Sequence, residues 1–211
     1  MDVGALDGVR FSNTRRFFEK GWSGLCIEAA SQNHAALEVL YRGTSVATEH
    51  AAVTDHSGTA TFHAVSNRAD DGGLSGAGSL IAGRTNRWPG YRWHTEDVPA
   101  DTLDNILARH NLDDFDLLTI DVEGAEVEVL DGFSFRQRPM LLIIESNDPE
   151  GIIQRVIPHG YRVWLDTGQD LFLTHVTDWR WMMLRVLGNL LGSRPFRRLL
   201  RMVSRATPRG G

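Results

Sequence analysis

The sequence has a single cysteine and no long apolar run. Because Cys26 is alone among 211 residues, no disulfide can form within the chain, and a reducing cytoplasm is the expected compartment. A membrane-spanning helix needs about 18 or more consecutive apolar residues, and none is present. We expect no signal peptide ahead of the first motif and find no internal repeat. The composition is that of a globular domain of ordinary size.

The net charge of −5 combines two parts of opposite sign. Residues 176–211 hold eight arginines and one aspartate, whereas residues 1–175 hold 14 basic and 26 acidic side chains. We predict a basic, amphipathic helical tail over residues 177–211. This tail would lie on an anionic membrane surface, or pack on the domain or on a second subunit as a homodimer. An acidic body without a base-stacking motif argues against nucleic acid as a partner.

Short apolar runs alternate with helical patterns along the chain. Runs of consecutive apolar residues are typical of parallel strands buried on both faces. The predicted strands are 24–29, 44–53, 115–121, 140–146 and 161–166. The predicted helices are 12–20, 33–41, 101–110, 125–130 and 150–159, with Ser12 and Asp101 as N-caps. This alternation predicts an α/β fold with a parallel sheet covered by helices on both faces.

Two stretches depart from this alternation. Residues 59–65 follow the turn signal "DHSG", so we predict a hairpin with the preceding strand. Residues 66–95 are rich in Gly, Ser and Arg and show no regular pattern. A segment of this length is usually a functional lid or disordered, and Trp88, Tyr91 and Trp93 favour a lid.

The opening sequence "DVGALDG" has the character of a ligand-binding loop. In an open α/β sheet, ligands bind beyond the carboxyl ends of the strands where the strand order reverses. Gly4 and Gly8 would allow a sharp turn there, and the following helix would direct its N-terminus into the same crevice. Glu28 ends the next strand about 20 residues later, where nucleotide-binding folds place an acid that holds the ribose.

Three residues of this loop indicate which nucleotide it suits. A dinucleotide site needs glycine where Leu6 stands, because the pyrophosphate must touch the backbone. Asp2 and Asp7 are poor neighbours for a pyrophosphate but suit a cation. S-adenosylmethionine, which carries a sulfonium and an ammonium but no phosphate, therefore fits better than a dinucleotide.

Further acids follow two neighbouring strands. In "LLTIDVEGAEVEVLDGF" an apolar strand runs into Asp121 and Glu123, and in "IIESND" the next strand ends on Glu145 and Asn147. The carboxyl ends of neighbouring central strands meet at one edge, so these side chains would face the ligand crevice. Glu126 either joins them or is a solvated helix position.

In this order, the motifs resemble the FkbM family of S-adenosylmethionine-dependent methyltransferases. The resemblance spans residues 2–175 and rests on "DVGALDG", "SNT" with "EKGWSGLCIEA", "AAVTDHSGTATF", "TLDNIL", "LLTIDVEGAEVEVLDGF" and "IIESN". It implies a domain over residues 1–176 with the class I methyltransferase fold, which is Rossmann-like. That fold has a seven-stranded, mostly parallel sheet with helices on both faces and a reversed last strand, here 171–176. The family has a helix and a full first strand ahead of the loop, so with only Met1 before Asp2 we expect a truncated first strand.

The resemblance also implies O-methylation of a hydroxyl on a sugar, a glycolipid or a secondary metabolite. The contacts assigned to S-adenosylmethionine are Asp2, Gly4 and Asp7 at the methionine end, Ser12 and Asn13 at its carboxylate, Glu28 at the ribose and Asp55 at the adenine. For Asp55 an ordinary turn acid is the alternative.

The predicted catalytic residues are Asp121, Glu123 and Glu145. Class I enzymes place a group close to the methyl at the position of Asp121, and Glu123 or Glu145 could remove the hydroxyl proton. Crowded acids raise one another's pKa toward a useful range. Asp121, Glu145 and Asn147 also form an oxygen set acceptable to Mg²⁺, but we assign no metal.

Two other functions stay open. One is a nicotinamide-dependent oxidoreductase, which Leu6 disfavours. The other is a non-catalytic, membrane-associated binding module, suggested by the short start and the basic tail. The expected location is cytoplasmic, with peripheral membrane contact as an alternative.

Overall fold

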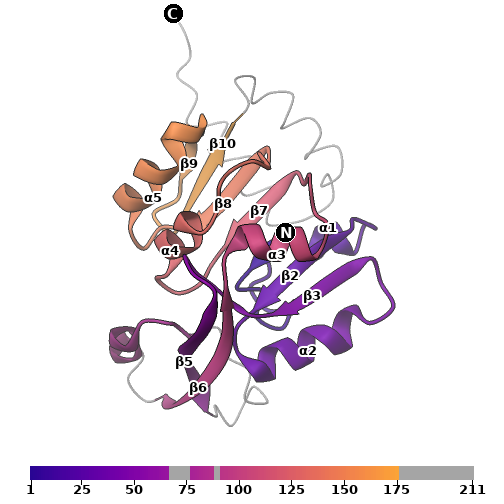
Figure 1. Cartoon of the computed structure of the whole chain (residues 1–211), viewed down its shortest axis with the longest axis vertical. Helices are drawn as coiled ribbons and strands as arrows, with labels where there is room; N and C mark the ends of the chain where they lie inside the picture. Colours follow the sequence, from indigo (N-terminus) through magenta and orange to yellow (C-terminus); the bar gives the residue numbers. More distant parts are fainter. Residues whose placement is uncertain (67–76, 88–90, 176–211) are drawn as a thin grey trace, which may run out of the picture. The chain divides into compact units, whose positions relative to one another are not determined.

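A computed structural model describes residues 1–66, 77–87 and 91–175 (Figure 1). In chain order the elements, with η for 3₁₀ helices, are β1 (Asp2–Val3), α1 (Arg15–Phe18), β2 (Gly24–Glu28), α2 (Ser31–Tyr41), β3 (Val46–His50), β4 (Ala52–Val53), β5 (Gly58–Ser66), η1 (Ala82–Arg87), β6 (Arg92–Asp101), α3 (Leu103–Arg109), β7 (Leu117–Ile120), α4 (Glu126–Asp131), β8 (Leu141–Glu145), α5 (Pro149–Val156), η2 (Ile157–His159), β9 (Arg162–Asp166) and β10 (Asp170–Thr174). The predicted basic tail lies outside the described residues. Among the residues described, no helix is long and apolar enough to cross a membrane.

Seven strands form one sheet in the order β3-β2-β1-β7-β8-β10-β9. Neighbouring strands from β3 to β8 pair in parallel, whereas β10 is antiparallel to both β8 and β9. The predicted sheet with a reversed last strand is therefore confirmed. The strand order reverses between β1 and β7, and this point is where such sheets bind ligands.

The first strand is short, as expected, yet it is paired on both sides. Asp2 lies opposite Cys26 of β2 and Thr119 of β7, and Val3 lies opposite Ile27 and Ile120. The two residues of β1 thus join the two halves of the sheet.

Successive side chains of β2 point to opposite faces of the sheet, and helices cover both faces. Leu25 and Ile27 point into the large core, which contains residues of α3, α4 and α5. Cys26 points to the opposite face and packs with Leu37 and Tyr41 of α2. All four residues of β7 are buried, and three of them are apolar, as expected for a strand covered on both faces.

The predicted hairpin of residues 59–65 with the preceding strand is wrong. The predicted strand 44–53 divides into β3 in the main sheet and β4 in a second sheet of order β4-β6-β5. β5 pairs antiparallel with β6 over nine residue pairs, from Gly58 opposite Ala100 to Ser66 opposite Arg92. The turn signal correctly predicts that the chain reverses. However, β4 has only two residues to pair with, whereas the distant β6 pairs with β5 along its whole length.

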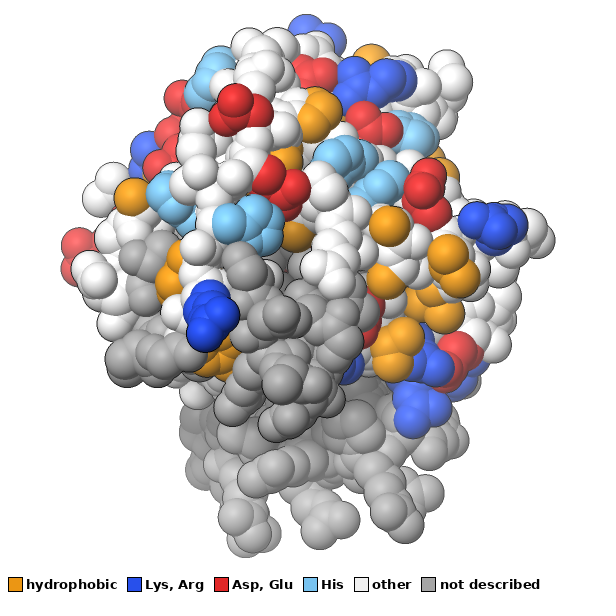
Figure 2. Space-filling model, turned by 90° about the horizontal axis from the view of Figure 1, so that it is seen from below, with side chains coloured by type: hydrophobic (Ala, Val, Ile, Leu, Met, Phe, Trp, Pro, Cys, Tyr) orange, Lys and Arg blue, Asp and Glu red, His pale blue; other side chains and the backbone are white. Residues whose placement is uncertain are grey.

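The segment predicted as a lid begins and ends in this second sheet. Its last residues, from Arg92 on, belong to β6, and residues 67–76 and 88–90 lie outside the described part. Figure 2 views the domain from the end where β5, β6 and α2 lie in Figure 1. On that face, Lys and Arg side chains stand in small separate groups among carboxylates and histidines.

Both predicted N-caps are corrected. Thr102, not Asp101, caps α3, because its hydroxyl accepts a hydrogen bond from the Asn105 N–H. Asp101 is the last residue of β6, and its carboxylate accepts from Thr102 N–H and from the Arg109 guanidinium. Ser12 is not the N-cap of α1 either, because Thr14 directly precedes Arg15, although Ser12 Oγ accepts a hydrogen bond from the N–H of Arg15 at 3.0 Å.

Gly4 should tolerate no side chain. Its φ is +83°, and a Cβ there would lie 1.8 Å from the carbonyl oxygen of Asp121. Gly43 has a similar φ of +75°, with nothing within 4 Å of the corresponding position. Gly43→Ala should therefore cost about 1–2 kcal/mol from backbone strain alone, whereas Gly4→Ala should cost roughly 3–5 kcal/mol because overpacking adds to strain. Urea unfolding of both variants measures this, and equal losses would contradict the assigned close approach.

Candidate active site

The opening loop lies against the end of β7 at the switch point. Its backbone turns at Gly4, and the N–H groups of Gly4 and Ala5 both donate to the carbonyl of Ile27. Leu6 then adopts a φ of +53°, a left-handed conformation that costs a non-glycine residue about 1–2 kcal/mol. This conformation directs the Leu6 N–H to Oε2 of Glu28, at 2.9 Å.

A pocket opens between this loop, the ends of β2 and β7, and the second sheet. Its lining residues are Val3, Gly4, Leu6, Ile27, Glu28, Ala29, Asn33, Ala51, Ala52, Val53, Phe62, Gly78, Leu80, Asp121, Val122 and Glu123. Most of these are apolar and three are carboxylic acids, and the described residues of the lining include no lysine, arginine or histidine. Such a pocket suits an organic cation with apolar parts and is unfavourable for a phosphate.

Glu28 is built into the wall of this pocket. Oε1 accepts hydrogen bonds from the Ala30 N–H at 2.9 Å and the Asn33 amide at 3.3 Å, and Oε2 accepts one from the Leu6 N–H. A carboxylate oxygen has two lone pairs, so Oε2 keeps one acceptor site for a ligand hydroxyl. Burial nevertheless raises the pKa of Glu28 to about 7, against the lowering effect of these donors.

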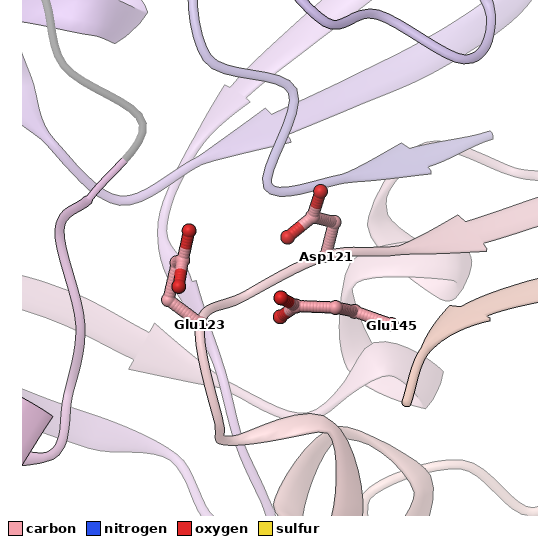
Figure 3. Close-up of side chains that lie close together, drawn as sticks. All are labelled: Asp121, Glu123 and Glu145. Atoms are coloured by element: carbon pink, nitrogen blue, oxygen red, sulfur yellow. The ribbon is translucent and has the colours of Figure 1, made fainter. Parts of the chain in front are cut away.

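Three further carboxylates converge beside the pocket (Figure 3). Asp121 follows β7, Glu123 lies two residues on, and Glu145 ends β8; one oxygen of each lies within 4.8 Å of the others. Burial, reinforced by the charge of Glu123, raises the pKa of Asp121 to about 7. Burial, together with the charge of Asp121, raises the pKa of Glu145 to about 8. The predicted catalytic residues are thus brought together, although Glu145 is not among the residues that line the pocket.

The predicted cofactor residues do not all converge. Gly4 and Glu28 line the pocket, but the other five do not, namely Asp2, Asp7, Ser12, Asn13 and Asp55. The two oxygens of Asp2 accept the hydroxyls of Thr14 and Thr119, at 2.6 and 2.5 Å. Asp2 is thereby used within the protein.

The remaining predicted contacts also serve local structure. Asp7 accepts the N–H groups of Val9 and Arg10 and forms an ion pair with the Arg10 side chain at 2.8 Å. Asn13 is exposed. Asp55 is half exposed and hydrogen-bonded to His56, as a turn acid would be.

From the sequence, Asn33 was not identified as a residue of the site, and two alternatives remained open for Glu126. Asn33, which orients Glu28, lies five residues after it on α2, and only the helix geometry brings it back to the strand end. Glu126 is 1% exposed, so the solvated alternative is wrong, and its charge acts on Asp121 and Glu145 of the acidic cluster that these two residues form with Glu123. Its position three residues after Glu123 was the available signal.

A cation is the alternative occupant of the acidic cluster. Asp121, Glu123 and Glu145 offer three oxygens at a spacing that a divalent ion could bridge. Asn147, expected among such donors, instead donates its amide N–H groups to Glu126 and Glu145.

The strand order and the acidic pocket at the switch point define an α/β protein of the class I methyltransferase type. The chain belongs to the FkbM methyltransferase family, because the family profile of the methyltransferase FkbM domain matches residues 2–179. No curated protein and no solved structure matches the chain. The family resemblance of the motifs is thereby confirmed, and the oxidoreductase alternative gains no support.

The raised pKa of Asp121 predicts how stability depends on pH. The folded chain holds this proton more tightly than the unfolded chain, so its stabilising effect is complete below pH 4 and is lost as pH rises through about 7. Asp121→Asn should abolish this loss. Relative to wild type, the variant should gain about 1–3 kcal/mol of unfolding free energy between pH 5 and pH 8.

Urea unfolding at both pH values tests this expectation. Groups distant from Asp121 titrate alike in the two proteins, so they cancel in the comparison. The difference between the proteins therefore reports Asp121 together with its effect on the pKa of Glu145. Asp113→Asn is the matched control, because Asp113 is exposed and lies outside the acidic cluster. A variant with the same pH dependence as wild type would show that the Asp121 carboxyl titrates normally.

Proposed function

We propose that the protein is an S-adenosylmethionine-dependent O-methyltransferase whose acceptor is a hydroxyl of a small molecule or glycan. One observation carries the proposal: Glu28, Asp121 and Glu123 line one pocket at the switch point, and none of the described residues in that lining is basic. Membership of a methyltransferase family supports it. The hydroxyl acceptor and the cofactor itself go beyond that membership.

The residues present fit this cofactor. Oε2 of Glu28 can accept a ribose hydroxyl, and Ile27, Ala52 and Val53 offer an apolar surface to an adenine ring. At the other end, Asp121 favours positive charge. When bound, S-adenosylmethionine would supply an electrophilic methyl group on a positively charged sulfur.

The acidic cluster suits removal of a hydroxyl proton. A general base works best when its pKa is near the operating pH, and the pKa values of Asp121 and Glu145 are raised to about 7 and 8. One of them would hydrogen-bond the acceptor hydroxyl and hold its proton. The other, with Glu123, would stabilise the positive charge at the reacting centre.

The pocket disfavours a nicotinamide dinucleotide. The buried Leu6 side chain occupies the loop position at which such a cofactor needs glycine, and its N–H is already taken by Glu28. The three carboxylates of the lining would also repel a pyrophosphate. A non-catalytic binding module needs no such convergence of acids with raised pKa values.

Calorimetry with S-adenosylmethionine, S-adenosylhomocysteine and NAD tests the cofactor. We expect binding of the first two and none of NAD. Glu28→Ala should weaken S-adenosylmethionine binding about tenfold or more, because it removes the ribose acceptor and frees the Leu6 and Ala30 N–H groups. Glu38→Ala, an exposed acid on α2, is the control and should bind like wild type. Binding of NAD alone would overturn the proposal.

Asp121→Asn tests the chemistry. The variant keeps the size of the side chain but is a much weaker base, so methyl transfer should slow by roughly 10²–10⁴-fold. The measurement is incorporation of labelled methyl groups from S-adenosylmethionine into an extract of small molecules and glycolipids, followed by mass spectrometry of the products. Affinity for S-adenosylmethionine should change little by comparison. An unchanged rate would remove Asp121 from the reaction.

A further inference from the structure

Glu126 is a buried carboxylate that the proposed reaction does not use. It is the first residue of α4, is 1% exposed, and does not line the pocket. Its Oε1 accepts hydrogen bonds from the N–H of Gly124 at 2.8 Å and from the N–H of Val122 at 3.4 Å. The carboxylate therefore holds the backbone of the loop that begins at Asp121.

This loop has a conformation that its sequence would not adopt unaided. Glu123 has a φ of +54° and Gly124 a φ of +110°, and the first of these is unfavourable for a residue with a side chain. The hydroxyl of the buried Ser79 donates to the carbonyl of Glu123 at 2.9 Å. Glu126 thus binds two backbone N–H groups of the loop, and Ser79 binds one of its carbonyl groups.

Glu126 also connects this loop to the next strand end. The side-chain amide of Asn147 donates one N–H to Oε1 of Glu126 and one to Oε2 of Glu145. Through Asn147, the buried carboxylate of Glu126 is connected by hydrogen bonds to the end of β8 as well as to the loop after β7. Asp121 and Glu145 project from these two strand ends in Figure 3. The relative placement of the catalytic acids depends on these bonds.

We propose that Glu126 is a positioning residue, whose carboxylate holds the loop of residues 121–124 in the conformation that directs Asp121 and Glu123 toward the cofactor pocket. The role in methyl transfer rests on the proposed function, but the loop restraint does not. Glu126 acts through the backbone and through Asn147. It takes up no proton from the acceptor.

Two substitutions separate positioning from charge. Glu126→Gln keeps an oxygen that can accept from Gly124 and Val122, whereas Glu126→Ala leaves both N–H groups without this acceptor. Glu128→Ala, two residues on in the same helix, is the matched control, because Glu128 is only partly buried and is not part of the acidic cluster. Urea unfolding of each variant confirms that it is folded.

Amide hydrogen exchange of the protein without cofactor is the first readout. Exchange of the peptide that contains residues 122–124 should be about tenfold or more faster in Glu126→Ala than in wild type. Glu126→Gln and Glu128→Ala should retain most of the protection. Equal protection in Glu126→Ala and wild type would overturn the proposal, whether or not the protein is a methyltransferase.

Methyl incorporation is the second readout. At a fixed amount of extract, Glu126→Ala should lower the apparent kcat at least tenfold while the KM for S-adenosylmethionine changes less than threefold, and Glu126→Gln should restore most of the rate. A wild type without methyl incorporation refutes the proposed function and leaves the exchange result standing. An active wild type with an equally active Glu126→Ala variant refutes the positioning role.

Discussion

The close approach of the Gly4 backbone to the carbonyl of Asp121 is the contact on which the site depends. It is possible only because Gly4 has no Cβ, and it brings the loop after β1 against the end of β7 at the point where the strand order reverses. With the loop in that place, the Leu6 N–H reaches Glu28, and Glu28 and Asp121 line one pocket. A wider separation of these two loops would divide the pocket.

The second constraint is electrostatic. Burial raises the pKa of Glu28, Asp121 and Glu145 to near neutrality, and Asp121 and Glu145 also lie close together, whereas exposed carboxyls ionise at much lower pH. These raised pKa values lower the free energy of unfolding at neutral pH, a cost to stability that is common at functional sites. A positively charged ligand would relieve the repulsion among these acids. In the proposed reaction, the same arrangement would favour a sulfonium over a phosphate and would leave a carboxylate able to accept a proton.

Much of the main sheet and part of the site could be predicted from local pattern. The buried strands read as continuous apolar runs, and Glu28, Asp121 and Glu145 were found because each follows such a run. The partner of β5 could not be predicted, because the turn at residues 55–58 fixes only a reversal of the chain and not which distant segment completes the ladder. The placement of Asp2 escaped prediction for a similar reason: Thr14 and Thr119, which bind its carboxylate, lie 12 and 117 residues away.

The sequence by itself determined most strands of the main sheet and the helices between them, the acids at the strand ends and the glycine that the opening loop requires, because these depend on local periodicity and backbone sterics. Only the tertiary structure decided which acids face the pocket and which are used internally. Asp2 and Asp7 lie on either side of Gly4 in the sequence, yet both accept hydrogen bonds within the protein and do not line the pocket, whereas Glu28 does. Glu126 is buried although it is the first residue of its helix. Whether a carboxylate meets a ligand or a neighbouring N–H depends on side-chain direction and burial, which exist only once distant segments have packed together.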